Sequence, residues 1–276
     1  MKKEINQKIE KLVKEASFRL RPDVKKTIFS AFKKEKKKMP KQALGWILDN
    51  AEIAKAEKTA LCQDTGLPIV FFEIGYDIKV NSTLINEIKN EISRCYEKFC
   101  LRRSIVDPLQ RKKPRYQGVL EHIYFSSSQK GLRITLFPKG FGSENKAQLK
   151  MFNPTAKINE IEEFVLNCVQ EAGPESCPPF FIGIGIGGTS DHALLLAKKA
   201  LIDRIDLPNP DQKLKSIEKR IFTKINSLGI GPMGFGGRFT ALAVKIKKDQ
   251  THIAGLPVGV NVSCHALRSA TVKISV

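Results

Sequence analysis

Residues 178–203 read PPFFIGIGIGGTSDHALLLAKKALID, where an apolar strand pattern runs through glycines into a helical pattern. The run Phe180–Ile186 is short and uniformly apolar, which predicts a strand buried inside a sheet. The segment Asp191–Asp203 carries leucine and alanine at helical spacing and predicts a helix. This strand and helix indicate a sheet that is packed against helices.

The rest of the chain extends the mixture of helices and strands. Residues 3–57 predict three helices, with Pro22 opening the second and Pro40 the third, and we take residues 1–58 as a helical N-terminal cap. Further helices are expected at Ser82–Cys100, Ile158–Glu171 and Asp211–Asn226. Further strands are expected at Leu67–Ile74, Arg238–Lys248 and His252–Asn261, and at Leu120–Phe125 and Leu132–Phe137, which we expect to form a hairpin. The order predicts an α/β fold of mixed α+β type in one domain over residues 1–276, with the site on loops at strand ends.

Length and composition exclude several classes of protein. The chain has 276 residues, 42% of them hydrophobic and 27% charged, which is typical of a globular protein with a sizeable core. Its apolar stretches are shorter than the roughly 18 residues that a membrane-spanning helix needs. The N-terminus begins with charged residues and carries no apolar signal core, so we expect a cytoplasmic protein without membrane association.

The net charge of +19 is concentrated near the N-terminus, where residues 1–41 hold 13 Lys and two Arg against five acids. One hypothesis is a basic module that binds nucleic acid. The segment Lys33–Lys38 has no aromatic residue that could stack on a base, which favours a solvated helical face instead. Nucleic-acid binding is kept as the hypothesis from a second functional class.

Two glycine clusters raise the question of a cofactor. Gly183–Gly188 satisfies the dinucleotide pattern G-x-G-x-x-G, and Asp203 follows twenty residues after Gly183. In a dinucleotide fold that acid ends a second strand, whereas Asp203 ends a predicted helix, so we disfavour this interpretation. The second cluster, Gly229–Gly237, precedes a strand. Either cluster could present backbone N–H groups to an anion or form tight turns only.

Three of the six cysteines are typical of packing. Cys95 and Cys100 lie five residues apart on a predicted helix, about 140° around its axis, and therefore cannot share a metal ion. Cys168 occupies an apolar helical position.

The other three cysteines stand at junctions between predicted elements. Cys62 precedes an Asp-Thr-Gly turn, Cys177 precedes two prolines and the glycine-rich strand, and Cys264 follows a strand. Three thiolates from distant loops would suit a metal or cluster that keeps one position open. Unrelated buried cysteines are the alternative.

Four motifs occur in a fixed order along the chain: CQDTG at 62–66, PKGFGSEN at 138–145, GIGGT at 185–189 with KKAL at 198–201, and THIAGLP at 251–257 with Cys264-His265. Together they resemble the class I iron-sulfur hydro-lyase family in its split form, the α subunit of two-subunit fumarate hydratase or L-tartrate dehydratase. The resemblance covers roughly residues 40–276.

The resemblance implies a cofactor and a set of site residues. Cys62, Cys177 and Cys264 would bind a 4Fe-4S cluster whose fourth iron has no protein ligand and acts as a Lewis acid. The residues implied at the substrate are Gln63, Asp64, Arg102, Gly142 and His252. Arg102 would bind a carboxylate, Asp64 and His252 would exchange protons, and Gly142 would offer its backbone N–H.

The same resemblance implies the reaction and the partner. We expect reversible dehydration of a small 2-hydroxy dicarboxylate, with fumarate and L-malate as the leading pair and L-tartrate as the alternative. Single-chain fumarases continue beyond the position that matches Val276, so a separate β subunit would complete the site in an αβ or α2β2 assembly. Residues 111–118 depart from the family's Asn-Thr-Gly-Asp-Asn loop and contain four cations, which bears on substrate choice.

Overall fold

The computed structural model describes residues 2–114 and 117–274 and confirms a mixed α/β fold. Its helices are α1 (Lys2–Phe18), α2 (Pro22–Lys34), α3 (Lys38–Glu57), α4 (Ser82–Lys98), α5 (Phe141–Glu144), α6 (Ile158–Ala172), α7 (Ser190–Ile202) and α8 (Gln212–Ser227), with 3-10 turns η1 (Pro174–Ser176) and η2 (Pro232–Gly234). Its strands are β1 (Leu67–Gly75), β2 (Leu120–Ser126), β3 (Leu132–Lys139), β4 (Gln148–Phe152), β5 (Phe180–Gly188), β6 (Ala241–Thr251), β7 (Leu256–Ser263) and β8 (Ala270–Ile274). No helix in the described part of the chain is both long and apolar enough to cross a membrane.

The chain divides into two compact units. Unit 1 contains the described residues of 1–21, 50–141 and 268–276, and unit 2 contains residues 22–49 and 142–267. The three expected N-terminal helices are present, with α1 in unit 1 and α2 in unit 2. The single domain and its N-terminal cap stay predictions, because compactness alone does not show which parts fold independently.

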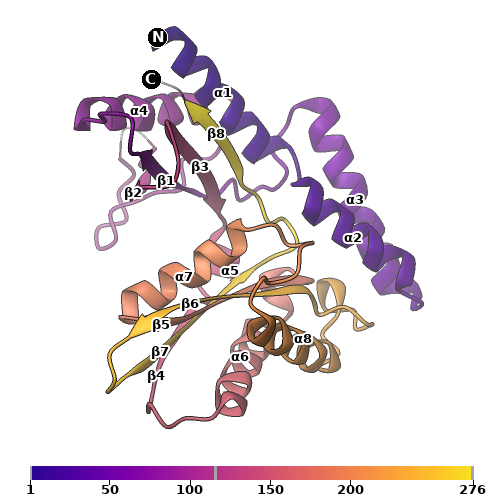
Figure 1. Cartoon of the computed structure of the whole chain (residues 1–276). Coiled ribbons are helices and arrows are strands. Elements are labelled where there is room, and N and C mark those ends of the chain that lie inside the picture. The colour runs from indigo at the N-terminus through magenta and orange to yellow at the C-terminus, as the bar shows by residue number, and fades with distance from the viewer. Residues whose placement is uncertain (1, 115–116, 275–276) are drawn as a thin grey trace. The chain divides into compact units, whose positions relative to one another are not determined.

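Unit 1 is a four-stranded sheet, in the order β2-β1-β3-β8, with α1 and α4 packed on one face (Figure 1). Apolar side chains alternate along β1, so Val70, Phe72 and Ile74 point into the core beneath the two helices. Ile88 and Ile92 enter the same core from α4 and are fully buried. This core holds the loop before β1, which carries the first predicted site residues.

The predicted hairpin of unit 1 is wrong, although both of its strands exist. β1 lies between them: it pairs in parallel with β2 and antiparallel with β3. The physical reason is burial. β1 is buried along most of its length and requires neighbours on both edges, whereas β2 exposes Ile123 and Phe125 and forms an edge.

Unit 2 is a mixed sheet with helices on both faces, in the order β4-β7-β5-β6. Its central strand β5 pairs in parallel with β6 and antiparallel with β7, while α7 covers one face and α6 and α8 the other (Figure 1). A Cβ on Gly183 would lie 2.1 Å from the carbonyl oxygen of Ala197, and one on Gly185 would lie 2.0 Å from that of Ala193. The glycines of the first cluster therefore let α7 pack directly on β5.

The second glycine cluster uses its backbone N–H groups inside the protein. Gly231 N donates to Thr240 Oγ1 at 3.1 Å, and Gly236 N donates to the carbonyl of Ile230 at 2.9 Å. These contacts favour the tight-turn interpretation. The mixed sheet and the position of Asp203 at the end of α7 agree with the argument against a dinucleotide fold.

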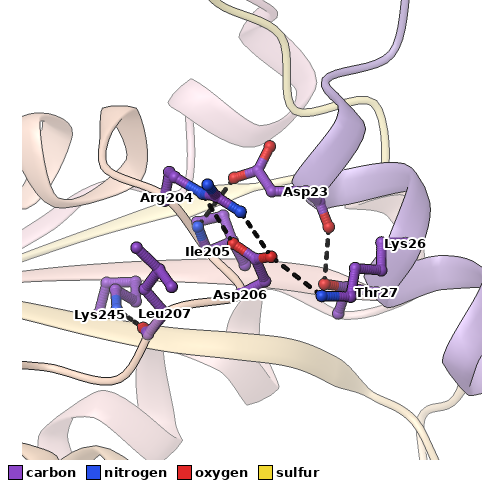
Figure 2. Close-up of polar contacts among 8 residues, drawn as sticks. All are labelled: Asp23, Lys26, Thr27, Arg204, Ile205, Asp206, Leu207 and Lys245. Carbon is purple, nitrogen blue, oxygen red and sulfur yellow. Dashed lines mark hydrogen bonds and ion pairs between the residues drawn. The ribbon is translucent and has the colours of Figure 1, made fainter.

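Helix α2 is fixed within unit 2 by polar contacts to the segment after α7, which Figure 2 shows. Asp23 Oδ2 accepts a hydrogen bond from Ile205 N at 2.8 Å. The carboxylate of Asp206 accepts two hydrogen bonds from the guanidinium of Arg204, at 2.8 and 3.0 Å. It accepts a third from Lys26 Nζ at 3.3 Å. The buried Lys245 donates to the carbonyl of Leu207 at 2.6 Å. These contacts give the polar side chains of α2 and β6 partners inside unit 2.

Candidate functional site

In unit 1 the predicted residue Asp64 lies in a tight turn before β1. Its Oδ1 accepts a hydrogen bond from Gly66 N at 3.0 Å, and its Oδ2 accepts one from Phe141 N at 2.8 Å. Gly66 has a φ of +81°, and a Cβ there would lie 2.7 Å from the carbonyl carbon of Pro138, so only glycine fits the turn. The carboxylate is therefore held by two backbone donors, and each of its oxygens keeps a further lone pair.

The same turn is joined to the predicted residue Arg102. Thr65, which is 3% exposed, accepts a hydrogen bond from Arg102 N at 3.0 Å and donates to Arg102 O at 3.3 Å. The hydroxyl of the buried Tyr96 points at the carbonyls of Thr65 and Gly66, at 3.5 and 3.4 Å. Unit 1 thus brings Asp64 and Arg102 together from positions 38 residues apart in the sequence.

Gln63 and Arg102 expose their side chains to solvent. The segment after Arg102 leads to the divergent loop at residues 111–118, and Ser104 N donates to Gln117 Oε1 at 3.2 Å, which joins the two ends of this segment. Arg111, Lys112 and Lys113 are exposed on this loop, whereas Arg115 and Tyr116 lie outside the described residues. These three cations of the loop are therefore exposed to solvent.

In unit 2 the structure brings together two of the predicted cluster ligands. Because β5 and β7 are antiparallel, the start of β5 and the end of β7 lie at the same end of the sheet. Cys177 lies shortly before β5, Cys264 directly after β7, and His265 N donates to the carbonyl of Cys177 at 3.3 Å. Cys177 has a left-handed backbone, with φ 56° and ψ 64°. Such strain in a non-glycine residue is typical of functional positions.

Gly142 is held at this end of the sheet by Ser176, the residue before Cys177. Ser176, which is 1% exposed, directs its hydroxyl at the carbonyls of Gly142 and Ala172, at 3.2 and 3.1 Å. A Cβ on Gly142 would meet no atom within 4 Å, and its φ lies outside the left-handed region. Packing therefore does not require glycine there, and the open space leaves room for a ligand beside the backbone.

A charged network fixes the end of α5 in unit 2. Glu144 binds Lys198 of α7 through a short ion pair, and Asn261 Nδ2 of β7 donates to Glu144 Oε2 at 2.9 Å. Asn261 is 1% exposed, and its Oδ1 has no hydrogen-bond partner among the described residues. This network holds Glu144, two residues after Gly142, in place.

The structure does not bring His252 to these cysteines within unit 2. It lies in the exposed turn between β6 and β7, and not in a strand as the sequence predicted. Cys264 follows the other end of β7, and eight residues of strand span roughly 24 Å. His252 Nδ1 accepts a hydrogen bond from Ala254 N at 3.2 Å, and this bond orients the imidazole ring within the turn. The implied role of His252 at the substrate stays a prediction.

The cysteines fall into classes that match the chemistry of a thiolate site. Burial, with nearby carboxylates as a second cause, raises the pKa of Cys95 to about 12 and that of Cys168 to about 12, which keeps both thiols protonated. Cys62, Cys177 and Cys264 are partly exposed and lie on loops, as ligands of a cluster require. The prediction that Cys100 packs in the core is wrong. It lies beyond the end of α4 with a φ of 53° and is exposed.

Neither unit, taken by itself over its described residues, holds three or more His, Cys, Asp or Glu side chains arranged for a metal ion. Unit 2 supplies two of the three predicted cysteines, and unit 1 carries the third. Pocket size does not identify the site either. A cavity of about 790 Å³ in unit 1 lies among lysines of α1 and α4 and contains none of the predicted site residues.

The basic N-terminal helices have ordinary partners for many of their charges. In α1, Lys8 pairs with Glu4 at 2.8 Å and Lys14 pairs with Glu10 at 2.7 Å, both at the i,i+4 spacing of a solvated helix. Lys33 lies over the ring of Phe29 on α2, with Nζ 4.5 Å from its centroid. These contacts favour the solvated-face interpretation over a nucleic-acid surface.

Several residues of the candidate site were not singled out from the sequence. In unit 1 they are Thr65, Tyr96 and Arg268, and in unit 2 they are Glu144, Ser176, Lys198 and Asn261. Thr65, Glu144 and Lys198 lie inside the quoted motifs, and that adjacency was the available signal. Tyr96, Ser176, Arg268 and Asn261 act through contacts that no local pattern indicates.

Comparisons with known proteins show which proteins this chain is similar to. The family model described as fumarate hydratase (Fumerase) matches residues 6–273. A putative L(+)-tartrate dehydratase subunit alpha of Methanocaldococcus jannaschii is 42% identical, over 98% of this chain and 97% of that protein. A putative fumarate hydratase class I of Geobacillus stearothermophilus is 32% identical over 95% of this chain but 53% of that protein. The L(+)-tartrate dehydratase subunit alpha of Escherichia coli K12 is 25% identical over 83% of this chain and 77% of that protein.

Proposed function

Because the chain belongs to the fumarate hydratase (Fumerase) family, we propose that it is the α subunit of a 4Fe-4S hydro-lyase that acts on a small 2-hydroxy dicarboxylate. The observation that carries this proposal is the turn of unit 1, where Asp64, two residues after Cys62, is joined to Arg102 through Thr65. A proton-transferring carboxylate, a carboxylate-binding cation and a soft metal ligand are the groups that metal-assisted dehydration needs.

The cluster would be held by the thiolates of Cys62, Cys177 and Cys264. When bound, a 4Fe-4S cluster with one iron lacking a protein ligand supplies a Lewis acid that makes the hydroxyl of the substrate a better leaving group. The partial exposure of these three cysteines supports the assignment, and so does the hydrogen bond between the Cys177 and His265 backbones. Cys95 and Cys168 are excluded as ligands by their burial in apolar cores.

The remaining roles follow from what each side chain can do. The exposed Arg102 guanidinium can bind a carboxylate bidentately, and its backbone is held by Thr65 so that the side chain starts from a fixed point. Gln63, exposed and adjacent to Asp64 in the chain, adds an amide. Asp64 uses the lone pairs that Gly66 and Phe141 leave open to accept the proton next to the second carboxylate. Gly142 offers its N–H from the first turn of α5, where the space beside its Cα is open.

The substrate is L-malate and fumarate in our proposal, with L-tartrate as the alternative. Both L-malate and L-tartrate are 2-hydroxy dicarboxylates, so the same donors can bind either, and the extra hydroxyl of tartrate decides between them. The 42% identical relative is named as a tartrate dehydratase subunit, which keeps that alternative open. The exposed cations of the divergent loop would favour a dianion of either kind.

The test is anaerobic co-expression with a β subunit of this family, in an αβ or α2β2 complex. We expect the complex to contain iron and sulfide and to convert malate, fumarate or tartrate, and we expect this chain alone to be inactive. The measurement is a diacid screen by absorbance of the unsaturated product, or of the keto product formed from tartrate. Turnover by the isolated chain would contradict the split site, and a complex that binds iron but converts no diacid would contradict the reaction.

Gly142→Ala tests the proposed backbone donor. A methyl group at this position meets no atom within 4 Å, so we expect an unchanged melting temperature. If the substrate lies against this backbone, the methyl group weakens one hydrogen bond, and KM rises about fivefold to tenfold with little change in kcat. Gly45→Ala on α3 is the matched control, because its Cβ would make an ordinary 3.4 Å contact with Phe32. An unchanged KM in Gly142→Ala would remove Gly142 from the site.

A further inference from the structure

Arg268 has an unusual environment for an arginine in unit 1. Its side chain is 2% exposed, and Nη2 donates to the carbonyl of Asp64 at 2.8 Å. Its other two guanidinium nitrogens, Nε and Nη1, are buried and have no hydrogen-bond partner among the described residues. A positive charge is thus buried with one neutral acceptor.

Stability does not explain this arrangement. Burying a charge is costly unless a carboxylate and further hydrogen bonds compensate for the lost water. Other arginines of this protein have such partners: Arg204 binds Asp206 through two nitrogens, and Arg220 Nε donates to Glu162 at 2.8 Å. No carboxylate lies within ion-pair distance of Arg268 in the described part of the chain.

The charge is aimed at the turn that carries the candidate site. A Cβ built on Gly140 would lie 3.1 Å from Asp64 Oδ2 and 3.9 Å from Arg268 Nη2, so the carboxylate and the guanidinium border the same small space. Burial raises the pKa of Tyr96, whose hydroxyl contacts this turn, and the charge of Arg268 opposes that rise while Asp64 adds to it. Tyr96 therefore stays a neutral hydrogen-bond donor at this turn.

We propose that Arg268 is a positioning residue of the dehydration site, acting through Asp64. Nη2 fixes the backbone of the Asp64 turn. The guanidinium charge stabilises the negative charge that gathers there: the Asp64 carboxylate, the Cys62 thiolate and the incoming dicarboxylate. A fixed carboxylate partner would cancel this charge, and its absence is what distinguishes Arg268 from a structural arginine. The inference rests on the proposed function.

Two substitutions separate the charge from the hydrogen bond. Arg268→Lys keeps a positive charge and a donor, whereas Arg268→Gln keeps a donor without the charge. We expect Arg268→Lys to retain kcat/KM within about tenfold of the unmodified complex. We expect Arg268→Gln to lose about 30-fold to 5,000-fold in kcat/KM, the range for removing one partner of a buried charged contact.

The experiment uses the anaerobic complex with the β subunit. Besides kcat and KM, it measures the iron content, the melting temperature and the affinity for succinate, a saturated dicarboxylate that cannot react. Succinate affinity should fall in Arg268→Gln and be largely kept in Arg268→Lys, with the iron content unchanged. Arg133→Gln is the matched control, since Arg133 lies in the same unit but is partly exposed and pairs with Glu73 at 3.4 Å.

Equal losses of turnover and of succinate affinity in the Lys and Gln variants would overturn the proposal and leave Arg268 a structural residue. If both variants lose their fold or their iron, Arg268→Ala with added guanidinium ion decides. Recovered succinate affinity supports the proposal, and no recovery overturns it. Succinate affinity and iron content do not depend on turnover. An unmodified complex that binds iron and succinate but converts no diacid would therefore contradict the proposed reaction, and the contrast between Lys and Gln would still test Arg268.

Discussion

Cys62→Ser, Cys177→Ser and Cys264→Ser, made one at a time in the complex with the β subunit, are each expected to remove the iron and sulfide and to reduce turnover to background. A cluster held by three thiolates keeps no spare protein ligand, and a serine hydroxyl is a poor, hard substitute for a soft thiolate. The measurements are iron and sulfide per chain, the visible absorbance of the anaerobic complex and the diacid assay. This is the largest effect that we expect from a single substitution.

The other three cysteines provide the controls. Cys100→Ser changes an exposed thiol and should leave iron, absorbance and activity unchanged. Cys95→Ala and Cys168→Ala remove buried thiols from apolar cores, so they should lower the melting temperature while the iron content is kept. Iron that survives in any of the three ligand variants would show that the corresponding cysteine is not a ligand. Iron lost equally from Cys100→Ser would contradict the whole assignment.

Asp64→Asn is expected to lower kcat by about 10² to 10⁴, the usual contribution of a positioned proton-transferring group, with the iron content kept. The amide cannot accept the substrate proton. It also turns an NH₂ group toward Gly66 N or Phe141 N, where the carboxylate accepts hydrogen bonds at 3.0 and 2.8 Å. Some loss of stability is therefore expected along with the loss of rate.

Asp77→Ala separates the two effects. Asp77 lies in the same unit, and its Oδ1 accepts a hydrogen bond from Gly131 N at 2.8 Å, so the alanine variant loses one backbone hydrogen bond away from the candidate site. We expect a similar fall in melting temperature and an unchanged kcat. The readouts are single-turnover rates, steady-state kcat and thermal unfolding of each complex. A kcat within a few fold of the unmodified complex for Asp64→Asn would exclude Asp64 as the proton-transferring group.

The sequence by itself determined most of the individual elements. Ranges such as Leu67–Ile74, Ile158–Glu171 and Phe180–Ile186 were predicted close to their observed bounds, because apolar periodicity is a property of neighbouring residues. The sequence also predicted the family, because four motifs occur in the order typical of it, and the family comparison confirms this prediction. The short elements α5, β4 and β8 were missed, because four or five residues hold too little periodicity.

Only the tertiary structure decided which elements meet. Periodicity tells which face of a strand is buried but not which strand lies beside it, so β2 and β3 were paired when β1 in fact separates them. His252 matched its motif, yet the length of β7 separates it from Cys264. The hydrogen bond from Arg268 to the carbonyl of Asp64 joins positions 204 residues apart, which no local pattern of the sequence indicates. Local chemistry selects the residues of a site, whereas long-range packing decides which of them act together.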